Sequence, residues 1–237
     1  MIERFRIWLL DFDGVLVDSY TCLPRVYEKI AYEIGLHEND VQKFVELCMK
    51  EEEKMEKREQ YDRKNALINV LREMNVKYET LDIDYLIELY WKERIKGSFL
   101  IDGVIETLNY LYRISTLVVV CGSDFWKDMK RQRINASGLS KFFREIIIIG
   151  EDFPDFASAI NYLRDKYFVR PDNMIIVNDR TSVICKTKKT GIITVRVKSH
   201  SFLEKLFENN CNPDFKADNL HELVLRMLTF NSFKCEI

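Results

Sequence analysis

The sequence predicts an α/β protein with a doubly wound parallel sheet and an inserted α-helical domain. Short apolar runs rich in Ile and Val recur along the chain, and helical patterns separate the later ones. Runs of this kind are typical of parallel strands that are buried on both faces. The alternation of the two patterns predicts an open sheet with crossover helices.

Five runs are expected to form strands, and two patterns between the later runs are expected to form helices. The strands are expected at residues 5–10, 117–120, 146–149, 174–177 and 192–197, and the helices at 156–167 and 181–189.

Residues 20–97 show helical periodicity, as in Leu67, Val70 and Leu71, and contain no convincing strand pattern. We therefore expect a core domain of residues 1–19 and 98–237 and a helical cap domain of residues 20–97. The charged segment 50–59 includes the i,i+4 pair Glu53 and Lys57 and is expected to be a solvated helix face.

The composition is typical of a globular protein and indicates which partners are not expected. With 237 residues, 47% of them hydrophobic, the chain is expected to bury a core. A net charge of −2 gives no electrostatic reason to expect nucleic acid or a membrane as a partner. No signal peptide, membrane span or CxxC pair is written in the sequence, so we expect a cytoplasmic protein whose six cysteines are buried thiols. Nothing in the sequence specifies an oligomeric state.

Asp11 and Asp13 directly follow the first apolar run. At about 4 Å and an effective dielectric constant of about 20, two such charges repel by roughly 4 kcal/mol. A divalent cation would remove this repulsion. The pair therefore suggests a magnesium-dependent site in which Asp11 is the nucleophile.

Ligands of an open α/β sheet bind beyond the carboxyl ends of its strands. The segments that follow the expected strands are therefore candidates for the site. They are residues 11–14, 121–124, 150–152 and 178–180, which are rich in acids and small residues.

The segment Asp11-Phe12-Asp13-Gly14-Val15-Leu16-Val17-Asp18-Ser19 resembles the first motif of the haloacid dehalogenase-like (HAD) superfamily, whose members are mostly phosphatases. Weaker similarities extend the resemblance over essentially the whole chain, including a helical cap between the first two motifs. They lie at residues 102–108, 138–139, 142–143 and 217–223.

This resemblance implies roles for both acids. Asp11 would attack phosphorus and form an aspartyl-phosphate, which splits one hard hydrolysis into two easier steps. Asp13 would protonate the leaving group and then activate water. Family members that displace halide lack an acid at the second position, so Asp13 favours phosphoryl chemistry. The alternative is that both acids only cap a turn.

The resemblance also implies a magnesium site and a phosphate site. Magnesium would bind the carboxylates of Asp11 and Asp179 and the backbone carbonyl of Asp13; alternatively, Asp179 caps the following helix. Cys121 stands where the family usually has Ser or Thr, so Ser123 or the amides of Gly122 and Ser123 would hold the phosphate. A catalytic role for Cys121 is the alternative.

Two departures from the family pattern concern the surrounding charges. No lysine occurs in residues 150–156, so Lys127, Lys130 or Arg180 would have to balance the charge of the nucleophile and the phosphate, unless these cations are surface charges. In the family's fourth motif a second acid commonly follows four or five positions after the first, but Val183 and Ile184 stand at those positions after Asp179. Alternatively, Asn178-Asp179 resembles the form of this motif with two adjacent acids, in which Asn178 takes the place of the first acid. Either departure predicts reduced magnesium affinity.

The function expected from the resemblance is a magnesium-dependent phosphatase that hydrolyses a small phosphomonoester, with the cap closing over the site. Two alternatives stay open. One is a sugar-phosphate mutase that uses the same pair of acids. The other is a catalytically degenerate member that binds a phosphorylated ligand or partner without turnover.

Overall fold

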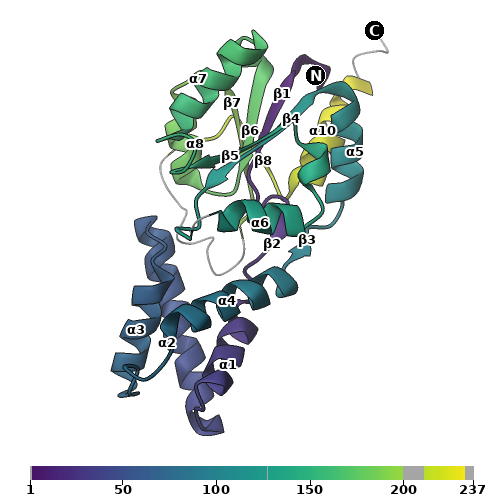
Figure 1. The fold of residues 1–237 in the computed structure, drawn as a ribbon. Helices are drawn as coiled ribbons and strands as arrows, with labels where there is room; N and C mark the ends of the chain where they lie inside the picture. Colours follow the sequence, from purple (N-terminus) through teal and green to yellow (C-terminus); the bar gives the residue numbers. More distant parts are fainter. Residues whose placement is uncertain (1, 127, 200–210, 233–237) are drawn as a thin grey trace. The chain divides into compact units, whose positions relative to one another are not determined.

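The computed structural model describes residues 2–126, 128–199 and 211–232. The chain divides into two compact units, one formed by Met1–Asp18 and Phe99–Ile237 and the other by Ser19–Ser98. The first unit holds a parallel sheet with helices, and the described elements of the second are helices (Figure 1). The expected fold class, an α/β sheet with an inserted helical segment, is confirmed.

The main sheet has six parallel strands in the order β5-β4-β1-β6-β7-β8. The first strand of the chain, β1, therefore lies between β4 and β6. The strands are β1 (Ile7–Leu10), β4 (Thr116–Gly122), β5 (Glu145–Ile149), β6 (Met174–Asn178), β7 (Ile193–Val197) and β8 (Phe215–Ala217). Five of them correspond to the expected runs, while β8 was not expected. The first strand begins later than expected, because Ile2–Arg4 form a 3-10 turn to which Phe5 N donates a hydrogen bond.

Alternate side chains of the strands enter two cores on opposite faces of the sheet. In β1, Trp8 and Leu10 lie in one core while Ile7 and Leu9 lie in the other. Helices α5 (Val104–Ile114) and α10 (Leu220–Ser232) contribute to the first core, and α7 (Phe156–Tyr167) and α8 (Thr181–Lys188) contribute to the second (Figure 1). Burial on both faces explains why the strands are nearly uninterrupted apolar runs.

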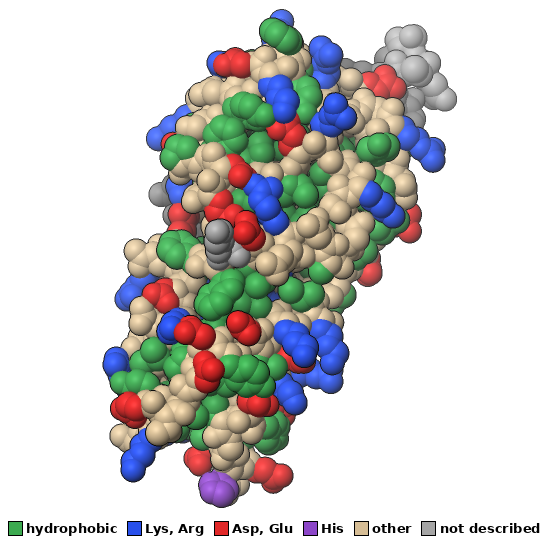
Figure 2. Space-filling model, in the orientation of Figure 1, with side chains coloured by type: hydrophobic (Ala, Val, Ile, Leu, Met, Phe, Trp, Pro, Cys, Tyr) green, Lys and Arg blue, Asp and Glu red, His purple; other side chains and the backbone are tan. Residues whose placement is uncertain are grey.

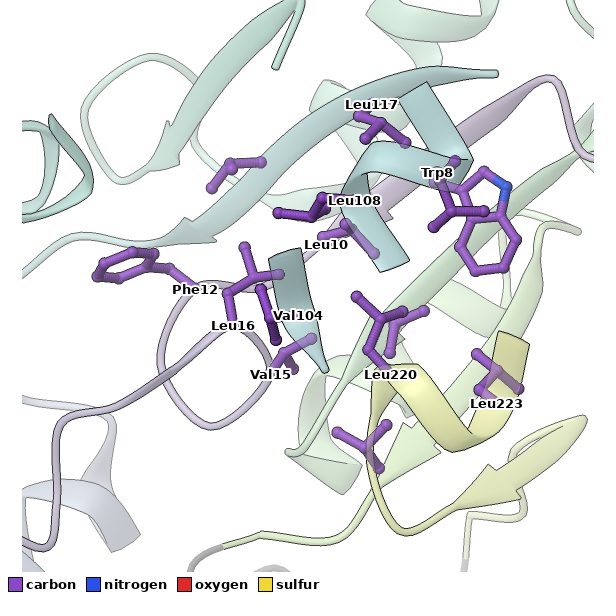
Figure 3. Packing of buried hydrophobic residues seen from close by; sticks show 14 of the residues in the cluster. Trp8, Leu10, Phe12, Val15, Leu16, Val104, Leu108, Leu117, Leu220 and Leu223 are labelled. Carbon is purple, nitrogen blue, oxygen red and sulfur yellow. The ribbon is translucent and has the colours of Figure 1, made fainter. Parts of the chain in front are cut away.

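The loop after β1 is anchored by its own apolar residues. Val15 and Leu16 are buried in the same core as Val104 of α5 and Leu220 of α10 (Figure 3). This packing fixes the position of the acidic part of the loop, because Val15 and Leu16, which directly follow Asp13 and Gly14, belong to the core.

A short antiparallel pair of strands joins the two segments of the first unit directly before and after the inserted residues. It consists of β2 (Val17–Asp18) and β3 (Phe99–Leu100), with Val17 opposite Leu100. Sequence patterns missed both strands because each has only two residues.

The second unit consists of α1 (Leu23–Glu33), α2 (Glu38–Arg58), α3 (Arg63–Glu73) and α4 (Ile83–Gly97). A buried polar network lies among its helices. Glu52 Oε1 accepts hydrogen bonds from the hydroxyls of Tyr27 at 2.6 Å and Tyr90 at 2.8 Å, and Arg63 donates to both of its carboxylate oxygens at 3.2 Å. Arg94 Nη1 donates to the Tyr90 hydroxyl at 2.7 Å.

The expectation that residues 50–59 form a solvated face is wrong for two of the acids. Glu52 is 1% exposed and Glu56 is 4% exposed, and both are buried together with Met55. Their spacing places them on the helix face that packs inward, and Glu52 is compensated by the network just described. A charged run alone does not reveal which of its members has buried partners.

The cysteines only partly match the expectation of buried thiols. Cys48 and Cys121 are buried, and Cys22, Cys185 and Cys211 are half-buried; Cys235 lies outside the described residues. On the face of the molecule drawn in Figure 2, charges of both signs are interspersed among apolar side chains. Among the described residues, there is no helix that combines the length and the apolar character needed to cross a membrane.

Replacing Glu52 by Gln is expected to lower the free energy of unfolding by about 3 kcal/mol, because removal of one partner leaves buried Arg63 without its countercharge. Urea unfolding followed by circular dichroism measures this change. The matched control on the same helix is Glu53→Gln, at a half-buried position, which is expected to change stability by less than about 0.5 kcal/mol. Equal effects of the two substitutions would contradict a stabilising role for the network.

The same network predicts acid sensitivity. Burial alone would raise the pKa of Glu52, but Arg63, Arg94 and the two tyrosine hydroxyls outweigh it and lower the pKa. A carboxylate with a lowered pKa in the folded state stabilises the fold above its unfolded pKa of about 4.3, and this contribution is lost as the pH falls through the folded value. Urea midpoints measured between about pH 6 and pH 3 should therefore fall more steeply for the wild type than for Glu52→Gln. Parallel pH profiles for the two proteins would be inconsistent with this assignment.

Candidate active site

The loop at the carboxyl end of β1 makes a tight turn around Gly14. Asp11 N donates to the Val177 carbonyl at 3.1 Å, which continues the strand pairing, and Gly14 N donates to the Val17 carbonyl at 2.9 Å. Gly14 has φ +78°, and a Cβ added to it would overlap the Asp179 carboxylate. Glycine is therefore required here both for its backbone conformation and for the close approach of Asp179.

Asp11 is buried and held through both of its carboxylate oxygens. Asn178 Nδ2 donates to Oδ2 at 2.6 Å, and Phe12 N donates to Oδ1 at 2.7 Å. Burial raises the pKa of Asp11 to about 6, and the charge of Asp13 adds to this effect, while Arg180 and Lys130 oppose it. The side chain is thus a desolvated carboxylate whose charge is only partly compensated by its surroundings.

Asp13 is 8% exposed and is bound by two cations from α6 (Met129–Ala136). Lys130 Nζ donates to Oδ2 at 2.5 Å. Arg133 reaches both oxygens, with Nη1 at 3.1 Å from Oδ2 and Nη2 hydrogen-bonded to Oδ1. The acid two positions after Asp11 is therefore neutralised by a helix more than a hundred residues away in the sequence.

Asp124, just after β4, holds the same two cations. Lys130 Nζ lies 2.8 Å from Asp124 Oδ1, and Arg133 Nη1 donates to Asp124 Oδ2 at 2.9 Å. Burial alone would lower the pKa of Lys130, but Asp124 and Asp13 outweigh it and raise the pKa, so the ammonium stays charged. Two buried carboxylates and two buried cations form one cluster, which we call the α6 charge cluster: Asp13, Asp124, Lys130 and Arg133.

Asp179 follows β6 and is fully buried. Ser199 Oγ donates to its Oδ2 at 2.9 Å, and Arg196 Nε donates to its backbone carbonyl at 3.3 Å. The alternative that Asp179 caps the next helix is wrong, because Arg180 is the N-cap residue of α8 and makes no side-chain capping hydrogen bond. The side chain instead lies against Gly14, at the end of the sheet where Asp11 and Asp13 are found.

The expected phosphate-binding turn lies at the end of β4. Cys121 is buried within the strand, and burial raises the pKa of its thiol well above the ordinary value, which does not suit a nucleophile. Ser123 N donates to the Ile149 carbonyl at 3.0 Å, and Ser123 Oγ donates to Glu151 Oε1 at 2.6 Å. Phosphate binding by Gly122 and Ser123 stays a prediction, and the Ser123 hydroxyl would have to leave Glu151 to take part.

Of the three candidate charge-balancing cations, the structure brings Lys130 into contact with Asp13 and places Arg180 where its charge acts on Asp11. Lys127 lies outside the described residues. Sequence reasoning missed the roles of Arg133 and Asp124. The only local signal was the i,i+3 spacing of Lys130 and Arg133, which puts two cations on one face of a helix.

Oxygen donors suited to magnesium meet at this edge. The Asp179 carboxylate lies close to Gly14, and Asp11 and the Asp13 carbonyl belong to the loop that contains Gly14. In the part of the chain that the structure describes, no group of three or more His, Cys, Asp or Glu side chains is placed to hold a metal ion. Magnesium binding by Asp11, Asp179 and the Asp13 carbonyl stays a prediction, for which oxygen donors are the suitable chemistry.

Comparisons with known proteins identify the family of this chain. The family model described as haloacid dehalogenase-like hydrolase matches residues 8–197. A curated relative, phosphoglycolate phosphatase of Vibrio vulnificus, is 27% identical over 143 residues, which cover 58% of this chain and 60% of the relative. The match thus spans less than two thirds of that relative.

Solved structures share the fold over nearly the whole chain. YfnB of Bacillus subtilis, assigned as a HAD hydrolase and solved with magnesium, has a TM-score of 0.71 at 19% identity, covering 94% of this chain and 99% of that one. A Thermotoga maritima protein assigned as a beta-phosphoglucomutase has a TM-score of 0.68 at 14% identity, covering 95% and 99%. Dehalogenases also occur among the structural matches. The family match and the fold together establish that this chain belongs to the haloacid dehalogenase-like hydrolase family.

Proposed function

We propose that this hydrolase is a magnesium-dependent phosphatase that acts on a small phosphomonoester. The observation that carries the proposal is the pair Asp11 and Asp13, two buried acids two residues apart at the carboxyl end of a central strand, with Asp13 bound by Lys130 and Arg133. The curated relative described as phosphoglycolate phosphatase supports a small phosphorylated substrate.

The two acids divide the reaction between them. A carboxylate oxygen of Asp11 attacks phosphorus, and the bond from phosphorus to the leaving oxygen breaks. Asp13, which must first take up a proton in place of one of its contacts to Lys130 or Arg133, gives that proton to the leaving oxygen. Asp13 then takes a proton from water as the water oxygen attacks the aspartyl-phosphate, which releases phosphate and restores Asp11. Hydrogen bonds from Asn178 and Phe12 hold the two Asp11 oxygens in a fixed orientation before the reaction.

Magnesium would be held by the carboxylates of Asp11 and Asp179 and by the Asp13 carbonyl. When bound, it supplies positive charge that reduces the repulsion between the nucleophile and the phosphate. Ser199 orients Asp179 through its hydrogen bond to Oδ2. Asn178, next to Asp179, is neutral, so it adds no negative charge near this site, and we expect a modest affinity for the ion.

Lys130 is the favoured charge-balancing residue among the three candidates. Its ammonium is buried, is close enough to Asp11 to lower that residue's pKa and touches Asp13 directly. Arg180 also acts on Asp11 but is only half-buried. A lysine ammonium is a point charge on a flexible stem, and an incoming phosphate would offer it a further acceptor.

One observation favours a second candidate, binding of a phosphorylated ligand or partner without turnover. The carboxylate of Glu151 accepts a hydrogen bond from Ser123 at the expected phosphate-binding turn, which places negative charge where a phosphate would have to bind. A sugar-phosphate mutase would use the same pair of acids, and the fold alone does not separate it from a phosphatase. Release of inorganic phosphate distinguishes the phosphatase from both alternatives.

Replacing Asp11 by Asn is expected to lower magnesium-dependent hydrolysis of 4-nitrophenyl phosphate by at least roughly 10³-fold, because the amide cannot form the covalent intermediate. Initial rates with and without magnesium measure this. Asp165→Asn, an exposed acid on α7, serves as the control and should keep wild-type rates. If the wild type shows no metal-dependent turnover above the level of Asp11→Asn, the phosphatase proposal should be abandoned.

Replacing Asp179 by Ala is expected to raise the magnesium concentration that gives half-maximal activity by about 10- to 100-fold, since one of two carboxylate ligands is lost. Activity titrated against magnesium chloride measures the shift, with Asp165→Ala as the matched control. An unchanged magnesium requirement in a folded Asp179→Ala protein would refute the ligand assignment.

A further inference from the structure

Arg133 is the residue that joins the two carboxylates of the α6 charge cluster. Its guanidinium contacts both oxygens of Asp13 and both oxygens of Asp124, the latter at 3.2 Å and 2.9 Å through Nη1. It also lies over the ring of Phe12, with 5.5 Å between Cζ and the ring centroid. One side chain thus touches the two residues of the catalytic loop that directly follow Asp11.

This arrangement is deeply buried. Arg133 is 3% exposed, and its two carboxylate partners are also buried. Charges removed from water are stable only when their partners meet them with good geometry, and the planar fork of arginine matches two carboxylates in a way that a lysine ammonium does not. The orientation of the Asp13 side chain is therefore set from α6 as well as from its own loop.

Lys130 and Arg133 hold Asp13 in different ways. Lys130 contacts one oxygen of Asp13 and one oxygen of Asp124 through a single nitrogen atom. If its ammonium turns to a bound phosphate, Asp13 and Asp124 stay connected through Arg133. Arg133 therefore holds the two carboxylates through more contacts than Lys130 does.

We propose that Arg133 is a positioning residue for Asp13, and that Asp124 is the anchor that keeps Arg133 in place. This inference rests on the proposed function, because it requires Asp13 to deliver a proton to the leaving group. In this role Arg133 acts through Asp13 and not on the substrate directly. Loss of Arg133 should therefore impair proton delivery more than it impairs binding or nucleophilic attack.

The test compares two leaving groups. An alkyl phosphate such as glycerol 2-phosphate needs a proton on its leaving oxygen, whereas 4-nitrophenolate leaves with little help. Because Asp13 also activates water in the second step, Arg133→Gln should lower kcat for both substrates. The loss should be at least about tenfold greater for the alkyl phosphate, with KM nearly unchanged for both. Arg133→Lys keeps the charge but loses the planar fork, so it should recover only part of the lost activity on the alkyl phosphate. Asp13→Asn should also lose more activity on the alkyl phosphate than on the aryl phosphate.

Arg131 provides the matched control on the same helix. It pairs with Asp152 away from the cluster, so Arg131→Gln should leave the ratio of the two activities unchanged. Asp124→Asn should give a smaller loss in the same direction as Arg133→Gln. Circular dichroism confirms that each variant is folded.

If Arg133→Gln does not fold, the same two activities are measured in Arg133→Lys and in the double variant Asp124→Asn/Arg133→Gln. The double variant removes one charge of each sign from the cluster. Equal losses on both substrates, or a rise in KM without a change in kcat, would overturn the positioning role. A wild-type protein that hydrolyses neither phosphate would instead overturn the proposed function itself.

Discussion

The constraint on which this structure depends is the crowding of carboxylates at the buried end of one strand. Parallel pairing of β1 with both β4 and β6 carries Asp11 into the centre of the sheet edge, where burial raises its pKa. Asp13 lies in the same loop, and Asp124 and Asp179 follow the neighbouring strands β4 and β6. Such a set of charges is stable only if cations are brought to it, and the fold supplies two of them from a single helix.

The surrounding residues fix the position of the loop that carries Asp11 and Asp13. Val15 and Leu16 fix the loop to the core under α5 and α10, and Gly14 allows Asp179 to approach the loop closely. The loop is consequently held by the apolar packing of Val15 and Leu16 and by the ion pairs of Asp13 with Lys130 and Arg133. Rigid support of this kind is what a nucleophile and a proton donor require, because catalytic groups lose efficiency when their positions vary.

Sequence reasoning predicted those features that local pattern determines. Continuous apolar runs such as 174–177 revealed strands buried on both faces, and the spacing of Asp11 and Asp13 placed two acids at a strand end. It did not reveal the partners of Asp13, because contacts to Lys130 and Arg133 depend on how α6 packs after folding. It also treated Glu52 as a surface charge, since nothing local distinguishes an acid with buried arginine and tyrosine partners from its exposed neighbours. Short elements such as β2 and β3 gave too little pattern to detect.

The central claim is that Asp11 carries a phosphoryl group during turnover. Borohydride reduces an aspartyl-phosphate to homoserine, so the protein can be quenched with borohydride during hydrolysis of 4-nitrophenyl phosphate and its peptides analysed by mass spectrometry. We expect homoserine at position 11 in the wild type with magnesium and substrate, and none without substrate. A modification at another residue, or turnover without any modification at position 11, would contradict it.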